Sequence, residues 1–279
     1  MVERARAAGV PFATRQEYTV RLATPAPAAA GASPARPGAR IVCLVPSITE
    51  LLFDLGLGGQ AVGRTGFCVH PREQVRDVPK VGGTKYVNLA KVRELAPTHL
   101  IVNIDENEKP TVEQLAGFIP NVIVTHPKSP LDNLPLYRML GGIFHQMSRA
   151  EALCAEFRSA YDAAVAACAT LPRERVLYLI WKDPWMTVSR DTYISRTLAA
   201  VGWDTLAVED ADRYPKIDLT PALLSGVDKV LLSSEPYAFR EKHLDEVRQM
   251  FSLVTRHSSL VTASLIDGEM TSWYGSRAI

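Results

Sequence analysis

A cysteine and a histidine stand two residues apart in the segment Phe67-Cys68-Val69-His70-Pro71. A thiol and an imidazole are both ligands for soft or borderline metals, or for the metal of a cofactor. Two ligands make an incomplete metal site, so a third donor must come from another part of the chain. The alternative is structural, with Cys68 packed inward and His70 in a turn before Pro71. Phe67, beside them, is a candidate ligand-binding residue.

Two further loops carry polar candidates. The segment Gly82-Gly83-Thr84-Lys85-Tyr86 pairs two glycines, which let backbone approach a ligand, with a cation suited to a phosphate or carboxylate. Its spacing is not that of a P-loop, and the alternative is a simple turn. Glu106 lies in the acidic segment 105–108. Its carboxylate suits a hard cation or ligand amides, whereas the alternative is a solvated acidic loop.

An aromatic pair, Trp181 and Trp185, follows the apolar segment 175–181. Pro184 fixes the turn between them, so that one ring can be presented rigidly. Flat apolar walls suit a macrocycle such as a corrin or a porphyrin. We expect both tryptophans near the ligand, Trp185 as the exposed one and the other in the core.

The remaining candidates also follow apolar segments. Ser47 comes after the segment 41–45, where it either caps the next helix or contacts a ligand. Glu235 and Tyr237 follow a later apolar segment, and Trp273 lies near the end of the chain. Because ligands bind beyond the carboxyl ends of parallel strands, this shared location gives the set its weight.

Short apolar segments alternate with helical patterns, which predicts mostly parallel sheets covered on both faces. Residues 131–169 have helical periodicity without a strand signal, which indicates one long helix or two nearly collinear ones. The expected fold is therefore α/β, with two Rossmann-like lobes joined by a long interdomain helix. We expect strands at 41–45, 61–64, 99–103, 121–125, 175–181, 204–208, 228–234 and 260–266.

The domain boundaries follow from this pattern. The segment 24–39 is rich in Ala and Pro and predicts a flexible lead-in, with a possible edge strand at 17–22. We predict a lead-in at 1–39, an N-terminal α/β lobe at 40–128, an interdomain helix at 129–171 and a C-terminal α/β lobe at 172–279.

The segments VPSITELLFDLG, GxTxFCxHP, VGGTKYVNLAKVRELAPTHLIV and RVLYLIWKDPWMTVSRDTYI, in this order, resemble the helical-backbone (class III) periplasmic binding proteins. This family includes vitamin B12-, haem- and ferric-siderophore-binding components of ABC importers, and its cobalamin-binding or helical-backbone metal receptor subgroup is the most similar. The resemblance implies a ligand held between two lobes without turnover. It implies a cobalamin-like corrinoid, haem or chelated iron as ligand, with no required cofactor.

The resemblance also implies an ABC permease as a partner, docked through one acidic residue on each lobe. The matching positions are Ala90 and Pro221, so the docking acids are not found. Residues 1–13 lack the continuous apolar region of a secretory signal, which predicts a cytoplasmic protein as written, or a periplasmic one if the N-terminus is mis-assigned. The alternative function is a cytoplasmic enzyme or metal-handling protein that uses Cys68, His70 and Glu235.

Composition narrows the classes of partner. The formal net charge of +1 gives no global field for nucleic acid or anionic lipid. No apolar segment approaches the roughly 20 residues of a membrane helix. Cys43, Cys154 and Cys168 lie in apolar or helical sequence as free thiols. We therefore expect a small-molecule ligand, no nucleic acid and no membrane insertion. No Ser-His-Asp order, HExxH or P-loop is present, which favours binding over catalysis.

Overall fold

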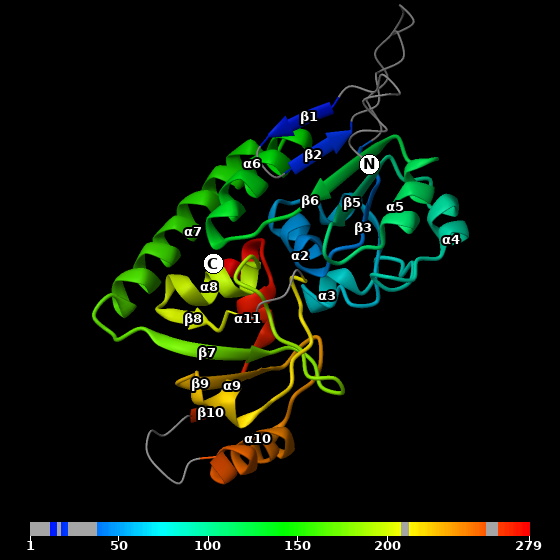
Figure 1. Ribbon diagram of the computed structural model, residues 1–279. Coiled ribbons are helices and arrows are strands. Elements are labelled where there is room, and N and C mark those ends of the chain that lie inside the picture. Colours follow the sequence, from blue (N-terminus) through cyan, green and yellow to red (C-terminus); the bar gives the residue numbers. More distant parts are fainter. Residues whose placement is uncertain (1–11, 16–17, 22–37, 208–211, 255–261) are drawn as a thin grey trace, which may run out of the picture. The chain divides into compact units, whose positions relative to one another are not determined.

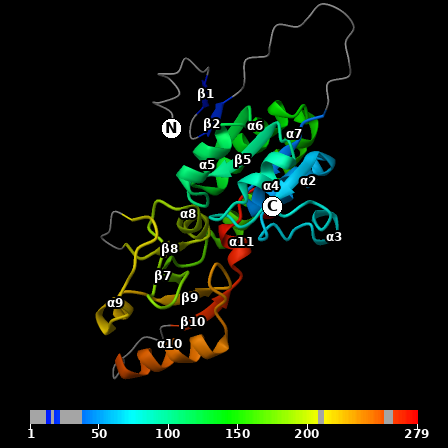
Figure 2. The same ribbon diagram turned by 90° about the vertical axis from the view of Figure 1, so that its right-hand side faces the viewer.

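The computed structural model describes residues 12–15, 18–21, 38–207, 212–254 and 262–279. The chain forms two compact units, which Figures 1 and 2 show as ribbons. The first unit contains the residues up to Pro127 together with Leu134–Cys154, and the second contains Lys128–Asn133 together with Ala155–Ile279. Each unit is built around one sheet.

The sheet of the first unit has the strand order β1-β2-β6-β5-β3-β4. Four strands are parallel, namely β3 (Ile41–Cys43), β4 (Ala61–Arg64), β5 (His99–Asn103) and β6 (Asn121–Thr125). The hairpin β1 (Phe12–Arg15) and β2 (Tyr18–Arg21) adds to β6 in the antiparallel sense. The strand expected at 17–22 is present as β2, but it is not the edge strand that we expected, because β1 lies outside it. Its partner β1 was not expected.

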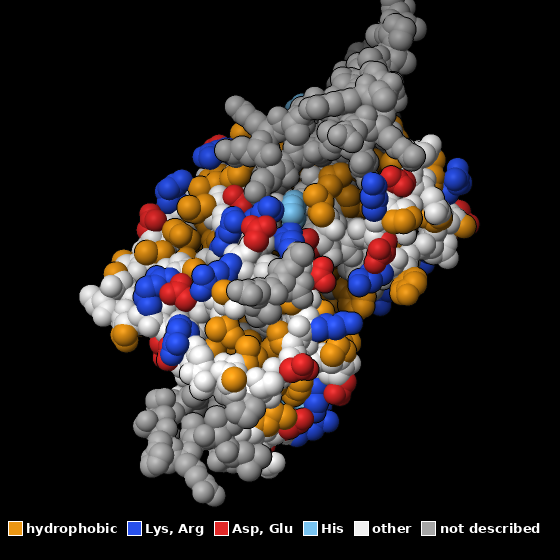
Figure 3. Space-filling view, in the orientation of Figure 1, with side chains coloured by type: hydrophobic (Ala, Val, Ile, Leu, Met, Phe, Trp, Pro, Cys, Tyr) orange, Lys and Arg blue, Asp and Glu red, His pale blue; other side chains and the backbone are white. Residues whose placement is uncertain are grey.

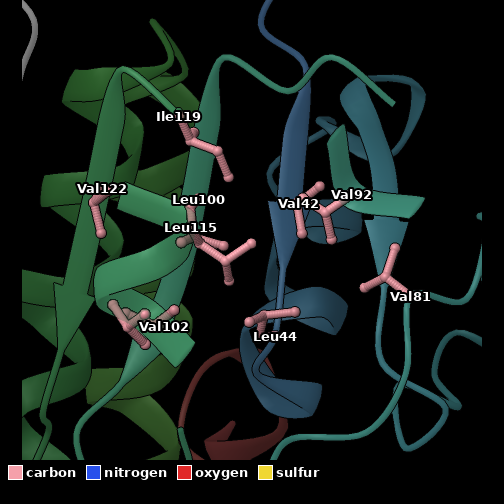
Figure 4. Packing of buried hydrophobic residues seen from close by; sticks show 10 residues of the cluster. Val42, Leu44, Val81, Val92, Leu100, Val102, Leu115, Ile119 and Val122 are labelled. Atoms are coloured by element: carbon pink, nitrogen blue, oxygen red, sulfur yellow. The ribbon is translucent and has the colours of Figure 1, made fainter. Parts of the chain in front are cut away.

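Helices cover both faces of this sheet. The helices between β3 and β6 are α2 (Pro46–Asp54), α3 (Arg72–Val75), α4 (Leu89–Glu94) and α5 (Lys109–Ala116), with a 3-10 turn at Gly58–Gln60. On one face, Val42 and Leu44 pack with Leu100 of β5, Val92 of α4 and Leu115 of α5, as Figure 4 shows. The alternate strand residues point to the opposite face, as the period of two requires. Because both faces of the sheet are buried, the strands carry apolar residues at consecutive positions.

Helix α2 follows β3 after a two-residue connection. Pro46 occupies its first turn, where the missing N–H leaves no intrahelical bond unmade. Gly56 ends the segment with φ of +76°, a conformation that a residue with a Cβ rarely adopts. The N-terminus of α2 is thereby fixed at the carboxyl end of β3.

The sheet of the second unit is entirely parallel, in the order β10-β9-β7-β8. Its strands are β7 (Glu174–Leu179), β8 (Trp203–Thr205), β9 (Lys229–Ser233) and β10 (Thr262–Ile266). Its helices are α8 (Tyr193–Ala200), α9 (Pro221–Ser225), α10 (Glu241–Val254) and α11 (Gly268–Ser272), followed by a 3-10 turn at Ser276–Ala278.

The two faces of the second sheet bury different helices. Leu177 and Leu179 pack with Leu224 of α9 and Leu244 of α10. Tyr178 and its face-mates pack with residues of α8. Figure 2 shows α8 and α10 on opposite sides of these strands. The predicted α/β fold with mostly parallel sheets is confirmed in both units.

The expectation of one helix, or two nearly collinear ones, at 131–169 is wrong in its geometry. A 3-10 turn at Pro130–Asp132 leads into α6 (Asn133–Ile143), and α7 (Met147–Cys168) follows. His145 adopts φ of +58° between the two helices, which reverses the chain.

Contacts along the two helices show that they run back along each other. The Arg138 guanidinium of α6 donates to both carboxylate oxygens of Glu151 at 2.7 and 2.8 Å. The Cys154 thiol donates to the Leu134 carbonyl at 3.6 Å. A Cβ on Gly141 would lie 2.5 Å from that of Ala150, so glycine permits the close approach. The two helices are therefore an antiparallel hairpin.

No helix of the described residues has both the length and the apolar character needed to cross a bilayer. Lys, Arg, Asp and Glu side chains are interspersed over the described part of the face in Figure 3. This mixed surface agrees with the formal net charge of +1.

Candidate functional site

One asparagine, Asn107, connects three loops at the carboxyl end of the first sheet. Its side chain is buried, with 9% of the residue exposed. Its Nδ2 donates to the carbonyls of Leu44, beyond β3, at 3.3 Å and of Thr84 at 3.0 Å. Its Oδ1 accepts from the backbone N–H of Asn103 at 2.8 Å. Sequence analysis missed this residue, because the carbonyls that it binds lie 63 and 23 residues away in the chain.

Asn107 holds the turn that presents Lys85 and Tyr86. The Gly83 N–H donates to the Tyr86 carbonyl at 2.8 Å, and Gly82 forms an antiparallel bridge with Val87. Gly82 has φ of +128°, and a Cβ there would lie 2.2 Å from the Tyr86 oxygen. The paired glycines therefore build a tight turn, and both predicted residues at its tip are exposed.

A buried arginine, Arg64, shapes the loop after β4. Its Nε donates to the carbonyls of Val75 and Val78 at 2.8 and 3.1 Å. Its Nη1 donates to the carbonyls of Thr65 and Cys68 at 3.2 and 3.0 Å. Charge-assisted bonds to four carbonyls fix the backbone that carries Phe67 and His70.

Large apolar side chains are exposed on these loops. Phe67 is 62% exposed, Tyr86 87% and Ile104, directly after β5, 57%. A Cβ on Gly83 would lie 3.4 Å from the Phe67 ring, so Phe67 lies beside the turn that presents Tyr86. Aromatic and aliphatic surface left exposed on rigid loops is typical of a binding site.

Cys68 does not reach this surface. Its thiol is fully buried, accepts a hydrogen bond from the Thr49 hydroxyl at 3.1 Å and lies 3.2 Å from the Thr65 hydroxyl. Burial raises the pKa of Cys68, so the thiol stays protonated at neutral pH. Cys68 therefore takes the structural role of the two alternatives, because it packs inward. His70 is half-buried, and its role as a metal ligand stays a prediction.

Other polar candidates of the first unit have mixed environments. Ser47 lies in the first turn of α2 and is 4% exposed, and its Oγ has no hydrogen-bond partner in the described part of the chain. Glu106 is half-buried beyond β5. Its neighbour Asp105 pairs with His126, beyond β6, at 3.4 Å. Within the residues that the structure describes, no three His, Cys, Asp or Glu side chains gather as a metal site would require.

In the second unit the two tryptophans exchange the roles that we predicted. Trp181 is 40% exposed and meets the Tyr237 ring edge-on at a centroid distance of 5.5 Å. Trp185 is half-buried, stacked on Phe239 at 5.9 Å with the rings 2° from parallel. The expectation that Trp185 is the exposed ring is wrong. The turn at 182–185 packs this ring against the hydrophobic core that α10 helps to form.

Glu235 and Trp273 are hydrogen-bonded to each other and do not form two separate surfaces of a binding site. The Glu235 Oε1 accepts hydrogen bonds from the Trp273 Nε1 and the Ser272 hydroxyl, both at 2.7 Å. Trp273 is only 8% exposed. Burial is the largest influence on Glu235 and raises its pKa, although both hydrogen bonds oppose this. Trp273 thus anchors the carboxyl group.

Residues 41–248 match the family described as periplasmic binding protein. This match spans well over half of the chain. The chain belongs to the periplasmic binding protein family. The family resemblance inferred from the sequence is thereby confirmed.

Individual relatives of the family are similar at low identity. The vitamin B12-binding protein of Vibrio vulnificus is 22% identical over 213 residues, which is 74% of each chain. The solved structure of the periplasmic vitamin B12-binding protein of Vibrio cholerae has a TM-score of 0.71 at 16% identity, covering 86% of this chain and 92% of that one. A periplasmic heme-binding protein of Pseudomonas aeruginosa has a TM-score of 0.69 at 20% identity, covering 86% and 88%.

These relatives bear on two of our expectations. Periplasmic binding proteins deliver solutes, and none of the comparisons supports the alternative of a cytoplasmic enzyme. The expectation of a cytoplasmic location is likewise not supported, whereas the periplasmic alternative fits the family.

Proposed function

We propose that this periplasmic binding protein holds a metal-bearing small molecule, a corrinoid first and haem or a chelated iron second, and performs no chemistry on it. The observation that carries the proposal is the exposed aromatic surface on carboxyl-end loops. Phe67 and Tyr86 present it in the first unit, and Trp181 presents it in the second. Flat, rigid apolar surface suits a macrocycle, whose two faces are themselves apolar.

The polar groups on these loops fit a ligand that brings its own metal. No group of three metal-binding side chains occurs in the part of the chain that the structure describes. A metal that enters already chelated needs no such group. Lys85, exposed beside Tyr86, supplies a cation for a phosphate or carboxylate at the edge of the ligand. The corrinoid stands first because several sequence relatives are named vitamin B12-binding proteins.

A ligand titration tests this function. Purified protein is titrated with cyanocobalamin, with haem and with a ferric siderophore, and tryptophan fluorescence and the ligand's visible spectrum are followed. We expect saturable binding of one ligand, weakened about tenfold or more by Tyr86→Ala and by Trp181→Ala, since each removes a large contact surface. Leu171→Ala is the matched control, because Leu171 is 60% exposed but lies between α7 and β7. Equal weakening by the control variant would contradict the assignment of the surface.

We further propose a periplasmic location and an ABC permease as partner. Ala90 on α4 is exposed, and Pro221 begins α9, so neither position offers an acidic docking residue. Docking would therefore use contacts other than the paired carboxylates that the resemblance implies. Cell fractionation tests the location, and co-purification with the permease from detergent extracts tests the partner. Recovery only in the cytoplasmic fraction would contradict this proposal.

A further inference from the structure

A hydrogen bond from the backbone determines where His243 carries its proton. His243 lies near the start of α10 and is 5% exposed. Its Nδ1 accepts a hydrogen bond from the backbone N–H of Arg240 at 3.0 Å. A ring nitrogen that accepts a hydrogen bond cannot carry a proton itself. The proton of the neutral imidazole is therefore on Nε2.

The surroundings keep His243 neutral. Burial is the largest influence and lowers its pKa. The positive charges of Lys242, Lys182 and Arg240 act in the same direction, and only the Glu246 carboxylate opposes them. The aromatic rings of Tyr237 and Phe239 complete the contacts, at centroid distances of 5.4 and 5.5 Å. At neutral pH the ring is therefore uncharged and has a single N–H that can donate a hydrogen bond.

His243 donates this N–H in a hydrogen bond to Tyr237. The His243 Nε2 lies 3.3 Å from the Tyr237 hydroxyl oxygen, and with the proton on Nε2 the imidazole must be the donor. The tyrosine oxygen then accepts, and its own O–H has no acceptor among the residues that the structure describes. Phe239, at 4.7 Å, and Trp181, at 5.5 Å, pack on the Tyr237 ring and hold it in place.

We propose that Tyr237 is an oriented hydrogen-bond donor of the ligand site, with His243 as its positioning residue, and that it binds a carboxylate or carboxamide oxygen of the ligand. This inference rests on the proposed function. Tyr237 follows β9 and contacts Trp181, the exposed ring of the same unit. The two residues divide the recognition, since Trp181 contacts an apolar face and Tyr237 contacts a polar substituent at the edge. The Tyr237 oxygen already accepts a hydrogen bond from His243, so its O–H is left to donate. It therefore favours ligands that present an acceptor oxygen to this O–H.

The orientation is testable without any ligand. Long-range proton–nitrogen correlation spectra of labelled protein at neutral pH report which ring nitrogen of His243 is protonated, and His243→Gln identifies the signal. We expect a neutral ring with the proton on Nε2. A proton on Nδ1, or a doubly protonated ring, would overturn the inference, because the tyrosine would then lack its fixed orientation.

The ligand role is tested with Tyr237→Phe, which keeps the packed ring and removes only the hydroxyl. We expect the Kd to rise about 5- to 10-fold for a carboxamide-bearing ligand such as cyanocobalamin. A carboxylate-bearing ligand such as haem should lose more, because bonds to charged acceptors are stronger. Tyr161→Phe, on α7, is the matched control and should leave the Kd unchanged.

The possible failures are distinguishable. If the wild-type protein binds and Tyr237→Phe binds equally well, the inference is overturned and the proposed function stands. If the wild-type protein binds none of the ligands, the proposed function fails, and the ligand role of Tyr237 fails with it.

Discussion

Replacing Asn107 with alanine should loosen the loops at the carboxyl end of the first sheet. The substitution removes three hydrogen bonds, from Nδ2 to the Leu44 and Thr84 carbonyls and from the Asn103 N–H to Oδ1. Leu44 and Asn103 are buried, so their backbone groups lose a partner that water does not readily replace. Each such group costs about 1–3 kcal/mol, whereas the half-buried Thr84 carbonyl regains water. With two such groups, the free energy of unfolding should fall by about 2–6 kcal/mol.

Urea unfolding measures the total, and hydrogen–deuterium exchange locates it. We expect faster exchange in peptides that contain residues 44–47 and 82–87, and unchanged exchange in peptides from β9. Because Tyr86 and Lys85 are at the tip of the second loop, ligand affinity should also fall, with faster dissociation.

A nearby asparagine gives the control. Asn88 caps α4 with one exposed hydrogen bond, from the Lys91 N–H at 3.0 Å. Asn88→Ala should cost about 1 kcal/mol and leave exchange at 44–47 unchanged. A loss of unfolding free energy in Asn107→Ala no larger than in Asn88→Ala, or added exchange spread evenly over both units, would contradict the role of Asn107 in joining these loops.

Three further predictions use the second unit and the thiols. In urea titrations, Trp185→Ala should lower the free energy of unfolding by about 2–3 kcal/mol, because the Trp185 ring packs on the core. Trp181→Ala should lower it by less than about 1 kcal/mol, because the Trp181 ring does not. Equal losses in the two variants would contradict this assignment of the buried ring. Since burial raises the pKa of Glu235 above its usual 4.5, the folded state holds that proton more tightly, and stability should fall as pH rises above 4.5. Glu235→Gln should remove the part of this fall that Glu235 causes above pH 4.5, and an unchanged slope would show that another group causes it. Alkylation of native protein, mapped by mass spectrometry, should reach the half-buried Cys168 well before the buried Cys68, and early labelling of Cys68 would contradict its placement.

Features set by continuous local pattern could be predicted from the sequence. The strands β3, β5 and β6 have apolar residues at their centres, all buried except the half-buried Val124, and this local pattern alone indicates buried strands. The position of candidate residues in loops after strands followed in turn from the parallel topology. The turn that carries Lys85 and Tyr86 could be predicted because paired glycines signal a turn.

Features set by tertiary contacts could not be predicted. Trp181 and Trp185 are chemically identical, and only packing on Phe239 decides which is buried. The loop 144–146 itself contains no glycine or proline to signal the reversal at His145, which depends on contacts such as that between Gly141 and Ala150. The three loops joined by Asn107 are far apart in sequence, so its role was invisible without the fold.

Equilibrium dialysis of the purified, ligand-free protein against cyanocobalamin, with absorbance read on both sides of the membrane, is the most direct test of the proposed corrinoid ligand. We expect saturation at one ligand per chain with a micromolar or lower Kd, raised at least about tenfold in the Trp181→Ala protein. Equal cobalamin concentrations on both sides of the membrane at every loading, from protein shown to be folded, would contradict the corrinoid assignment. The same result with haem and a ferric siderophore would contradict the proposed function as a whole.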